Sequence, residues 1–248
     1  MKKLILITGA STGIGQASAI LLAKHHHEVI ATVRDQKALR DLKKEMEAAN
    51  VKFRIELLDV RNEESVNALG IIIKEKYGYV DVLINATGYG LAGAIEDTSV
   101  EEGLAQFDTN FWGVHRVVRS ILPLMRIKKS GLIINISSGL GREGIPMAGF
   151  YCASKFALEG YSESLAHEVR PFGIKVVLVE PTENSSTFGK KIEVAVNSNS
   201  EHSVYYPKTY QAIQEIRKKT KTDAAPIHVA ELILKITETP RLKLRYKI

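Results

Sequence analysis

The chain has 248 residues, of which 45% are hydrophobic and 25% charged, as in an ordinary soluble globular protein. This length suits one α/β domain over residues 1–248 better than two. The formal charge of +6 indicates either a solvated basic surface or attraction for a polyanionic ligand such as a phosphorylated cofactor. No nucleic-acid-binding motif accompanies the charge, so we expect no nucleic-acid partner.

Short apolar runs alternate with amphipathic stretches, a pattern typical of repeated βα units. We predict an α/β fold, with a doubly wound Rossmann-type parallel sheet of about seven strands and helices on both faces. The predicted strands are 3–8, 28–33, 52–58, 80–85, 131–136, 174–180 and 242–246. The predicted helices are 13–25, 36–49, 62–76, 100–127, 150–170, 207–220 and 226–237.

The least regular segment, 183–205, leads into the helix at 207–220. A long loop in a compact domain often covers a binding site. We therefore expect a substrate-binding loop and helix at about 183–222. A tolerated surface insertion is the alternative.

Targeting and metal-binding signals are weak. The apolar run Leu4–Ile7 is too short for a secretory signal, and no apolar stretch approaches the roughly 18 residues of a membrane span. We expect a cytoplasmic protein without a membrane span. Cys152 is the only cysteine, which excludes an internal disulfide and a multi-cysteine metal site. The run 25–27 is three histidines, but neighbours at a helix end point in different directions, so we predict no metal site.

A glycine-rich turn joins the first predicted strand to the first predicted helix. Its glycines have the spacing G-x3-G-x-G. Glycines here allow a sharp turn and a close approach to a pyrophosphate, whose charge the helix N-terminus would meet. The spacing differs from G-x-G-x-x-G, so a simple tight turn is the alternative. We predict dinucleotide binding by Gly9, Ser11, Thr12, Gly13, Ile14 and Gly15.

The end of the second predicted strand indicates which dinucleotide binds. An acidic residue there favours NAD, whereas an arginine accommodates the 2′-phosphate of NADP. Arg34 is the first residue after this strand, and Asp35 follows at the position where the next predicted helix needs an N-cap. We therefore favour NADP(H) over NAD(H), with Asp35 as a cap. NAD(H) stays open as the alternative.

Polar residues follow two further strands at the same edge of the predicted sheet. They are Asp59 with Val60, and Asn85 with Ala86. We expect all four to line the cofactor crevice, where Asp59 would accept a hydrogen bond from the adenine amino group. The alternative is that the polar side chains only satisfy turn backbone.

Tyr151 and Lys155 are four residues apart on a predicted helix and therefore share one face. A phenol is a poor acid or base at neutral pH because its reference pKa is about 10. Lowering that pKa by two to three units costs roughly 3–4 kcal/mol. A cation about 4 Å away supplies about this much at an effective dielectric near 20. We therefore expect Lys155 to lower the Tyr151 pKa and make the pair competent for proton transfer.

Taken together, these residues resemble the short-chain dehydrogenase/reductase family, in its compact single-domain branch. The resemblance covers nearly the whole chain, and the stretch 151–160 is similar to members that act on steroids and retinoids. It implies an NAD(P)-dependent oxidoreductase that interconverts an alcohol and its ketone or aldehyde, with an apolar substrate. The matching residues are the turn 8–15, Asp59, Asn85, Ala86, Asn110, Ser137, Ser138 and the run 151–155.

The resemblance also implies roles for individual residues. Tyr151 would be the general acid/base, and Ser138 would polarise the substrate oxygen. Lys155 would lower the Tyr151 pKa and hold the nicotinamide ribose, and Asn110 would hold a water that links Lys155 to solvent. A homodimer or homotetramer would form through the helices at 100–127 and 150–170.

One departure from the family pattern follows the sixth strand, where Pro-Gly is usual and Pro181-Thr182 stands here. Thr182 lacks the freedom of glycine to adopt a positive φ. We expect Pro181 to contact the cofactor and Ser186, or else Thr187, to contact the nicotinamide carboxamide. The departure also motivates an alternative function, a catalytically inactive NADP(H)-binding sensor or regulatory protein on the same fold.

Overall fold

Seven parallel strands form the central sheet of the computed structural model, which describes residues 1–181, 192–219 and 225–248. Their order is β3-β2-β1-β4-β6-β7-β9. This confirms the predicted doubly wound sheet. The strands are β1 (Leu4–Thr8), β2 (Glu28–Val33), β3 (Arg54–Leu57), β4 (Val82–Asn85), β6 (Gly131–Ile136), β7 (Ile174–Glu180) and β9 (Arg245–Lys247).

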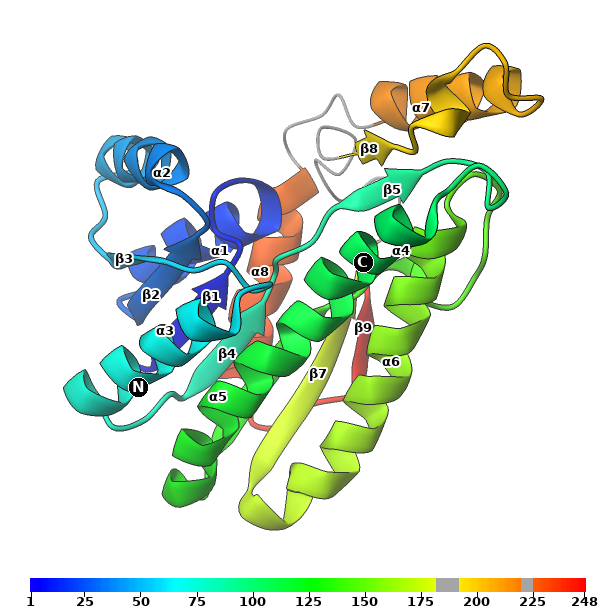
Figure 1. The fold of residues 1–248 in the computed structure, drawn as a ribbon. Helices are drawn as coiled ribbons and strands as arrows, with labels where there is room; N and C mark the ends of the chain where they lie inside the picture. Colours follow the sequence, from blue (N-terminus) through cyan, green and yellow to red (C-terminus); the bar gives the residue numbers. More distant parts are fainter. Residues whose placement is uncertain (182–191, 220–224) are drawn as a thin grey trace.

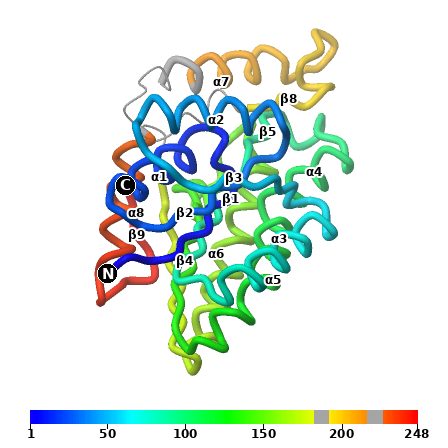
Figure 2. Tube along the Cα trace, turned by 90° about the vertical axis from the view of Figure 1, so that its left-hand side faces the viewer, coloured from blue at the N-terminus to red at the C-terminus, as the bar shows by residue number. Residues whose placement is uncertain are grey.

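Helices cover both faces of this sheet, which explains why its central strands are continuous apolar runs. Every residue of β1 and β4 is buried. One apolar cluster joins the sheet to α3, α5 and α6, and a second joins it to α1, α2 and α8. Figure 1 shows α5 and α6 side by side across one face, and Figure 2 shows α3 and α8 on opposite sides of the strands. Their bounds are α1 (Gly13–Lys24), α2 (Gln36–Ala48), α3 (Glu63–Lys76), α5 (Gly113–Lys128), α6 (Gly149–Val169) and α8 (Ala225–Glu238).

The chain reverses its direction of winding between β1 and β4. In open sheets of this kind, ligands bind outside the carboxyl ends of the strands at such a switch point. The ends of β1, β2, β3 and β4 therefore form the expected cofactor crevice.

The predicted single helix at 100–127 is wrong in detail. The structure has α4 (Val100–Phe107), a π-helical turn η1 (Asp108–Trp112) and then α5. A π turn inserts one residue into an otherwise helical pattern, so the apolar spacing still resembles one long helix. Such turns are frequent at functional sites.

A second, two-stranded parallel sheet lies at one end of the molecule, beside α7 (Tyr206–Lys219) in Figure 1. Its strands are β5 (Gly90–Ala92) and β8 (Ile192–Val194). The described part of segment 183–205 is thus more regular than predicted, with β8 followed by a 3-10 turn at Asn197–Asn199. Within the described ranges, no helix combines the length and apolarity needed to cross a membrane.

Candidate active site

The glycine turn brings the first helix N-terminus against the end of β4. Gly9 has φ of +71°, and a Cβ at that position would lie 2.7 Å from the Thr87 backbone. A Cβ on Gly15 would lie 2.5 Å from the Gly9 carbonyl oxygen. Gly13 also has a positive φ, and Thr12 is the N-cap of α1. Glycine is therefore required at positions 9 and 15 because a Cβ there would collide with neighbouring backbone, and the turn is tightly packed.

The remaining residues lie at the surface of this turn. Ser11 and Ile14 are half-buried. Thr12 is exposed, and its side chain makes no capping hydrogen bond to the helix within the described residues. The first turn of α1 thus has no cap from the Thr12 side chain, which fits an anion site at the helix N-terminus.

Arg34 and Asp35 follow β2 with distinct environments. The Asp35 carboxylate accepts a hydrogen bond of 2.9 Å from the Ala38 N–H and caps α2. This backbone hydrogen bond lowers the Asp35 pKa, and the nearby Arg34 lowers it further. Arg34 keeps its side chain 68% exposed, with Nε 3.8 Å from an Asp35 carboxylate oxygen. The acidic residue is thus engaged by its own helix, and the arginine projects at the strand end.

Asp59 lies at the end of β3 but is already engaged by Arg61. The Arg61 Nε and Nη2 donate to its two oxygens at 3.0 and 2.8 Å, and the Arg61 backbone N–H donates at 3.0 Å. The side-chain hydrogen bonds from Arg61 lower the Asp59 pKa. Val60 is 5% exposed and packs in the core, so its side chain does not line the crevice.

Asn85 also differs from its predicted place in the crevice. Its side chain is 2% exposed and donates a 2.8 Å hydrogen bond to Asn135 on the neighbouring strand. Asn135 in turn donates to Ser162 on α6 at 2.8 Å. Paired in register across two central strands, these amides tie the sheet to α6 rather than facing a ligand. The Ala86 backbone lies against Gly9.

Ser138, Tyr151 and Lys155 meet beyond the end of β6. The Ser138 hydroxyl is hydrogen-bonded to the Tyr151 phenol and accepts from the Leu140 N–H at 3.1 Å. The Lys155 Nζ donates to the Ile136 carbonyl at 2.8 Å and lies 5.8 Å from the Tyr151 ring centroid. Lys155 and Tyr151 are 5% and 6% exposed. The hydroxyl, phenol and amine thus form one nearly buried group.

The pKa of Tyr151 contradicts the expected effect of Lys155. Burial raises the pKa of Tyr151 to about 12, and the hydrogen bond with Ser138 opposes this only in part. Burial also lowers the pKa of Lys155 to about 8. The prediction considered only the neighbouring cation at an effective dielectric near 20, whereas here burial desolvates the charged form of each group. Tyr151 is therefore a neutral phenol over the physiological pH range.

Asn110 lies in the π turn η1 and connects the backbone of Tyr89 to Ser154 on α6. Its Oδ1 accepts from the Tyr89 N–H at 3.2 Å, and its Nδ2 donates to the Tyr89 carbonyl at 3.0 Å and to Ser154 at 3.2 Å. A Cβ on Gly88 would lie 3.2 Å from the Asn110 Oδ1 and 3.8 Å from the Lys155 Nζ. The π turn thus places a fully buried amide beside the catalytic lysine predicted from sequence.

The sequence matches the family model of the short chain dehydrogenases over residues 3–197. The chain belongs to the short-chain dehydrogenase/reductase family. It is 40% identical to the 3-ketodihydrosphingosine reductase of Bacteroides thetaiotaomicron over 99% of this chain and 87% of that protein. It is also 40% identical to human retinol dehydrogenase 8, over 78% of this chain and 62% of that protein. A crystal structure of a short-chain dehydrogenase from Streptomyces avermitilis superposes with a TM-score of 0.85 at 34% identity, covering 100% and 88% of the two chains.

Members of this family are NAD(P)-dependent oxidoreductases, and so is this short-chain dehydrogenase/reductase. Of its predicted nicotinamide contacts, Pro181 is described. It is buried, and its carbonyl accepts from the Gly139 N–H, next to Ser138, at 2.9 Å. Thr182, Ser186 and Thr187 lie outside the described residues.

Sequence reasoning missed the residues that join the described parts of segment 192–219 to the rest of this short-chain dehydrogenase/reductase. Asp97 accepts hydrogen bonds from Ser198 at 2.9 Å and Ser203 at 2.6 Å. Met147, four residues before Tyr151, has φ of +62°, and its sulfur accepts from the Thr209 hydroxyl on α7. Neither residue belongs to a recognisable motif, so only the fold reveals these contacts.

Proposed function

We propose that the protein is an NADP(H)-dependent oxidoreductase that interconverts an alcohol and its ketone or aldehyde, with Tyr151 as acid/base. The observation that carries this proposal is the hydrogen bond between the hydroxyls of Ser138 and Tyr151, with Lys155 one helical turn away. Two hydroxyl groups that face one point can both bond one substrate oxygen. Proton transfer by such a positioned group contributes about 10²–10⁴-fold to a rate.

The role of each residue follows from its chemistry. When bound, the nicotinamide supplies the hydride in reduction and accepts it in oxidation. In reduction, the neutral Tyr151 phenol gives its proton to the substrate oxygen, while Ser138 holds that oxygen by a hydrogen bond. The Lys155 ammonium stabilises the phenolate that remains, and Asn110 holds the neighbouring backbone of Tyr89 in place. The pKa of Tyr151, raised to about 12 by burial, keeps the phenol protonated before the transfer, and stabilisation of the phenolate by the Lys155 ammonium offsets its weak acidity.

The geometry of the glycine turn supports a dinucleotide, and the end of β2 supports NADP(H). Gly9 and Gly15 allow the sharp turn that precedes the N-terminus of α1, where a pyrophosphate would bind. Arg34 would bind the 2′-phosphate because its guanidinium projects at the strand end. Asp35, the residue that would compete by binding a free ribose hydroxyl, is engaged as a helix cap.

We further propose an apolar substrate, bound beneath the segment at about 183–222. The two relatives carry the names of a reductase for 3-ketodihydrosphingosine and a dehydrogenase for retinol, both apolar compounds. In this chain Ala92, Ala195 and Ile213 contribute buried apolar side chains from β5, the turn after β8 and α7. These elements come from the substrate-side segment and its partner strand.

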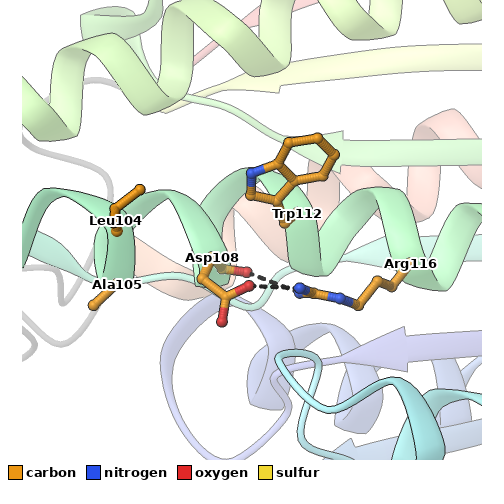
Figure 3. A pocket seen from close by; sticks show the side chains of 5 residues that line it. All are labelled: Leu104, Ala105, Asp108, Trp112 and Arg116. Atoms are coloured by element: carbon orange, nitrogen blue, oxygen red, sulfur yellow. Dashed lines mark hydrogen bonds and ion pairs between the residues drawn. The ribbon is translucent and has the colours of Figure 1, made fainter. Parts of the chain in front are cut away.

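A homodimer or homotetramer through α4, α5 and α6 is also proposed. Leu104 is 64% exposed and Trp112 49%, and both line a surface pocket with Ala105, Asp108 and Arg116 (Figure 3). Two of these lining residues, Asp108 and Arg116, form an ion pair of 2.7 Å. Large apolar side chains exposed along neighbouring helices are typical of a protein interface.

The test of the proposed function is Tyr151→Phe, with Tyr161→Phe as the matched control on the same helix. Turnover should be measured with NADPH on a panel of aliphatic ketones, aldehydes and retinoids, and NADPH binding by fluorescence. We expect Tyr151→Phe to lose at least about 100-fold in kcat with NADPH binding retained, because only the proton donor is removed. Tyr161→Phe should keep its rate.

Two results would count against this proposal. Unchanged turnover in Tyr151→Phe would remove the tyrosine as acid/base. Tight NADPH binding by the wild type without turnover on the whole panel would favour the alternative, an inactive NADP(H) sensor on the same fold.

A further inference from the structure

A buried carboxylate lies one helical turn beyond the proposed catalytic lysine. Glu159 follows Lys155 by four residues on α6, so the two side chains share a helix face. The Glu159 side chain is only 8% exposed. Taking an ionised carboxylate out of water is costly unless cations compensate it. The cations around Glu159 therefore need to be identified.

Arg245, on the edge strand β9, is the first of these cations. Its Nε donates to the Glu159 Oε2 at 2.9 Å and lies 3.6 Å from the Glu180 Oε1 at the end of β7. Arg142 donates to the same Glu180 oxygen at 2.9 Å. Glu163 accepts from the Arg245 Nη2 at 3.2 Å, but its side chain is 52% exposed. Two arginines thus connect two buried carboxylates.

This network lies directly against the proposed active site. A Cβ on Gly141 would lie 3.1 Å from the Glu159 Cγ and 3.3 Å from the Lys155 carbonyl oxygen. Gly141 ends the 3-10 turn that Ser138 caps. The backbone of the Ser138 turn therefore packs on Glu159 without an intervening side chain.

One oxygen of Glu159 has no donor of its own. Arg245 occupies Oε2, whereas Oε1 is buried and makes no hydrogen bond within the described residues. Arg245 therefore compensates only part of the carboxylate charge. The rest of the Glu159 charge lies in a region of low dielectric, where its electric field favours a second cation nearby. Lys155 is the cation on the same helix face.

We propose that Glu159 keeps the buried Lys155 in its ammonium form, as a positioning residue, and that Arg245 limits how strongly it does so. The inference rests on the proposed function for the part that Lys155 plays in turnover. Through Arg245, the edge strand β9 becomes an electrostatic component of the active site, although it is far in sequence from Tyr151 and Lys155.

Two further groups beside Lys155, the Asn110 amide near its Nζ and the Tyr151 phenol, carry no charge that could hold the ammonium form. Tyr151, on the same helix, is neutral, and the Ile136 carbonyl from β6 accepts one hydrogen bond from the ammonium. Burial lowers the pKa of Lys155 to about 8, and Glu159 opposes that change. Without Glu159 the ammonium would be the minor form at slightly alkaline pH. These opposing effects leave the Lys155 pKa at about 8, so the ammonium loses its proton at slightly alkaline pH.

The test is Glu159→Gln, with Glu163→Gln as the matched control that removes a carboxylate from the same arginine. The Lys155 pKa should be read by NMR of protein labelled with carbon-13 at lysine Cε, with the signal assigned by its loss in Lys155→Met. We expect Glu159→Gln to lower the Lys155 pKa by about one unit, and Glu163→Gln by less than about a third of a unit. Glu159→Asp should restore most of the shift.

Arg245→Met tests the same proposal through a change of the Lys155 pKa in the opposite direction. This test does not depend on whether the Glu159→Gln variant folds. Removing the cation frees the Glu159 charge, so the Lys155 pKa should rise. A Lys155 pKa that stays within about a third of a unit in both Glu159→Gln and Arg245→Met would overturn the inference. So would equal shifts in Glu159→Gln and Glu163→Gln.

Turnover separates this inference from the proposed function. If both hold, the alkaline limb of the kcat profile moves with the Lys155 pKa, to lower pH in Glu159→Gln and to higher pH in Arg245→Met. A pKa that moves while the kcat profile stays fixed would support the electrostatic link and contradict the role of Lys155 in turnover.

Discussion

Arg34→Ala should convert the proposed preference for NADPH into near indifference. The Arg34 side chain is 68% exposed at the end of β2. Among the described residues it forms one ion pair, a long contact of 3.8 Å with Asp35. A hydrogen bond to a charged group contributes about 1.5–3 kcal/mol, and exposure to solvent favours the lower half of that range. Each 1.4 kcal/mol is about tenfold in affinity, so we expect NADPH to bind roughly 10–50-fold more weakly. NADH affinity should change by less than about threefold.

Titration of both cofactors by protein fluorescence, with Arg40→Ala on α2 as control, measures this difference. The NADPH loss should shrink at higher ionic strength, because an exposed arginine–phosphate pair is screened by salt. Arg40→Ala should leave both affinities within about twofold. Equal losses for the two cofactors, or none for NADPH, would refute Arg34 as the selector.

Two further predictions concern stability and assembly. The free energy of unfolding should rise as the pH increases from about 8 to about 10, because folded Lys155 has released its proton while the unfolded lysine, with a pKa near 10.5, has not. Urea titrations should show that Lys155→Met lacks this rise, and parallel curves would contradict the lowered pKa of Lys155. Light scattering should give two or four times the 27.5-kDa chain mass for the wild type. Trp112→Glu should lower that mass and Ile71→Glu, on α3, should not; a monomeric wild type at micromolar concentration would contradict the interface.

The strands could be predicted where burial alone decides the residue types. β6 and β7 are runs of β-branched residues bounded by glycine, and their predicted bounds match the observed ones. β5 and β8 were missed because each has three residues, and their pairing depends on segments about 100 residues apart. The π turn around Asn110 was missed because an inserted residue leaves the apolar spacing of a helix nearly intact.

For the candidate site, sequence order identified which residues meet but not their charge states. The spacing of Tyr151 and Lys155 predicted a pair on one helix face, and the family resemblance added Ser138. The structure brings the three side chains together. The predicted direction of the Tyr151 pKa shift was wrong because burial, a property of the whole fold, raises the pKa and outweighs the hydrogen bond with Ser138. Asn85 was placed in the crevice because its partner Asn135 is 50 residues away and on another strand.

Transfer of deuterium from the nicotinamide to a carbonyl carbon tests the central claim most directly. Single turnovers with NADPH deuterated at C4 should place the label on the carbinol carbon of the alcohol product, detected by mass spectrometry. We predict labelled product from the wild type and a transfer rate at least about 100-fold lower in Tyr151→Phe at saturating cofactor. Equal transfer rates for the two proteins would contradict the account.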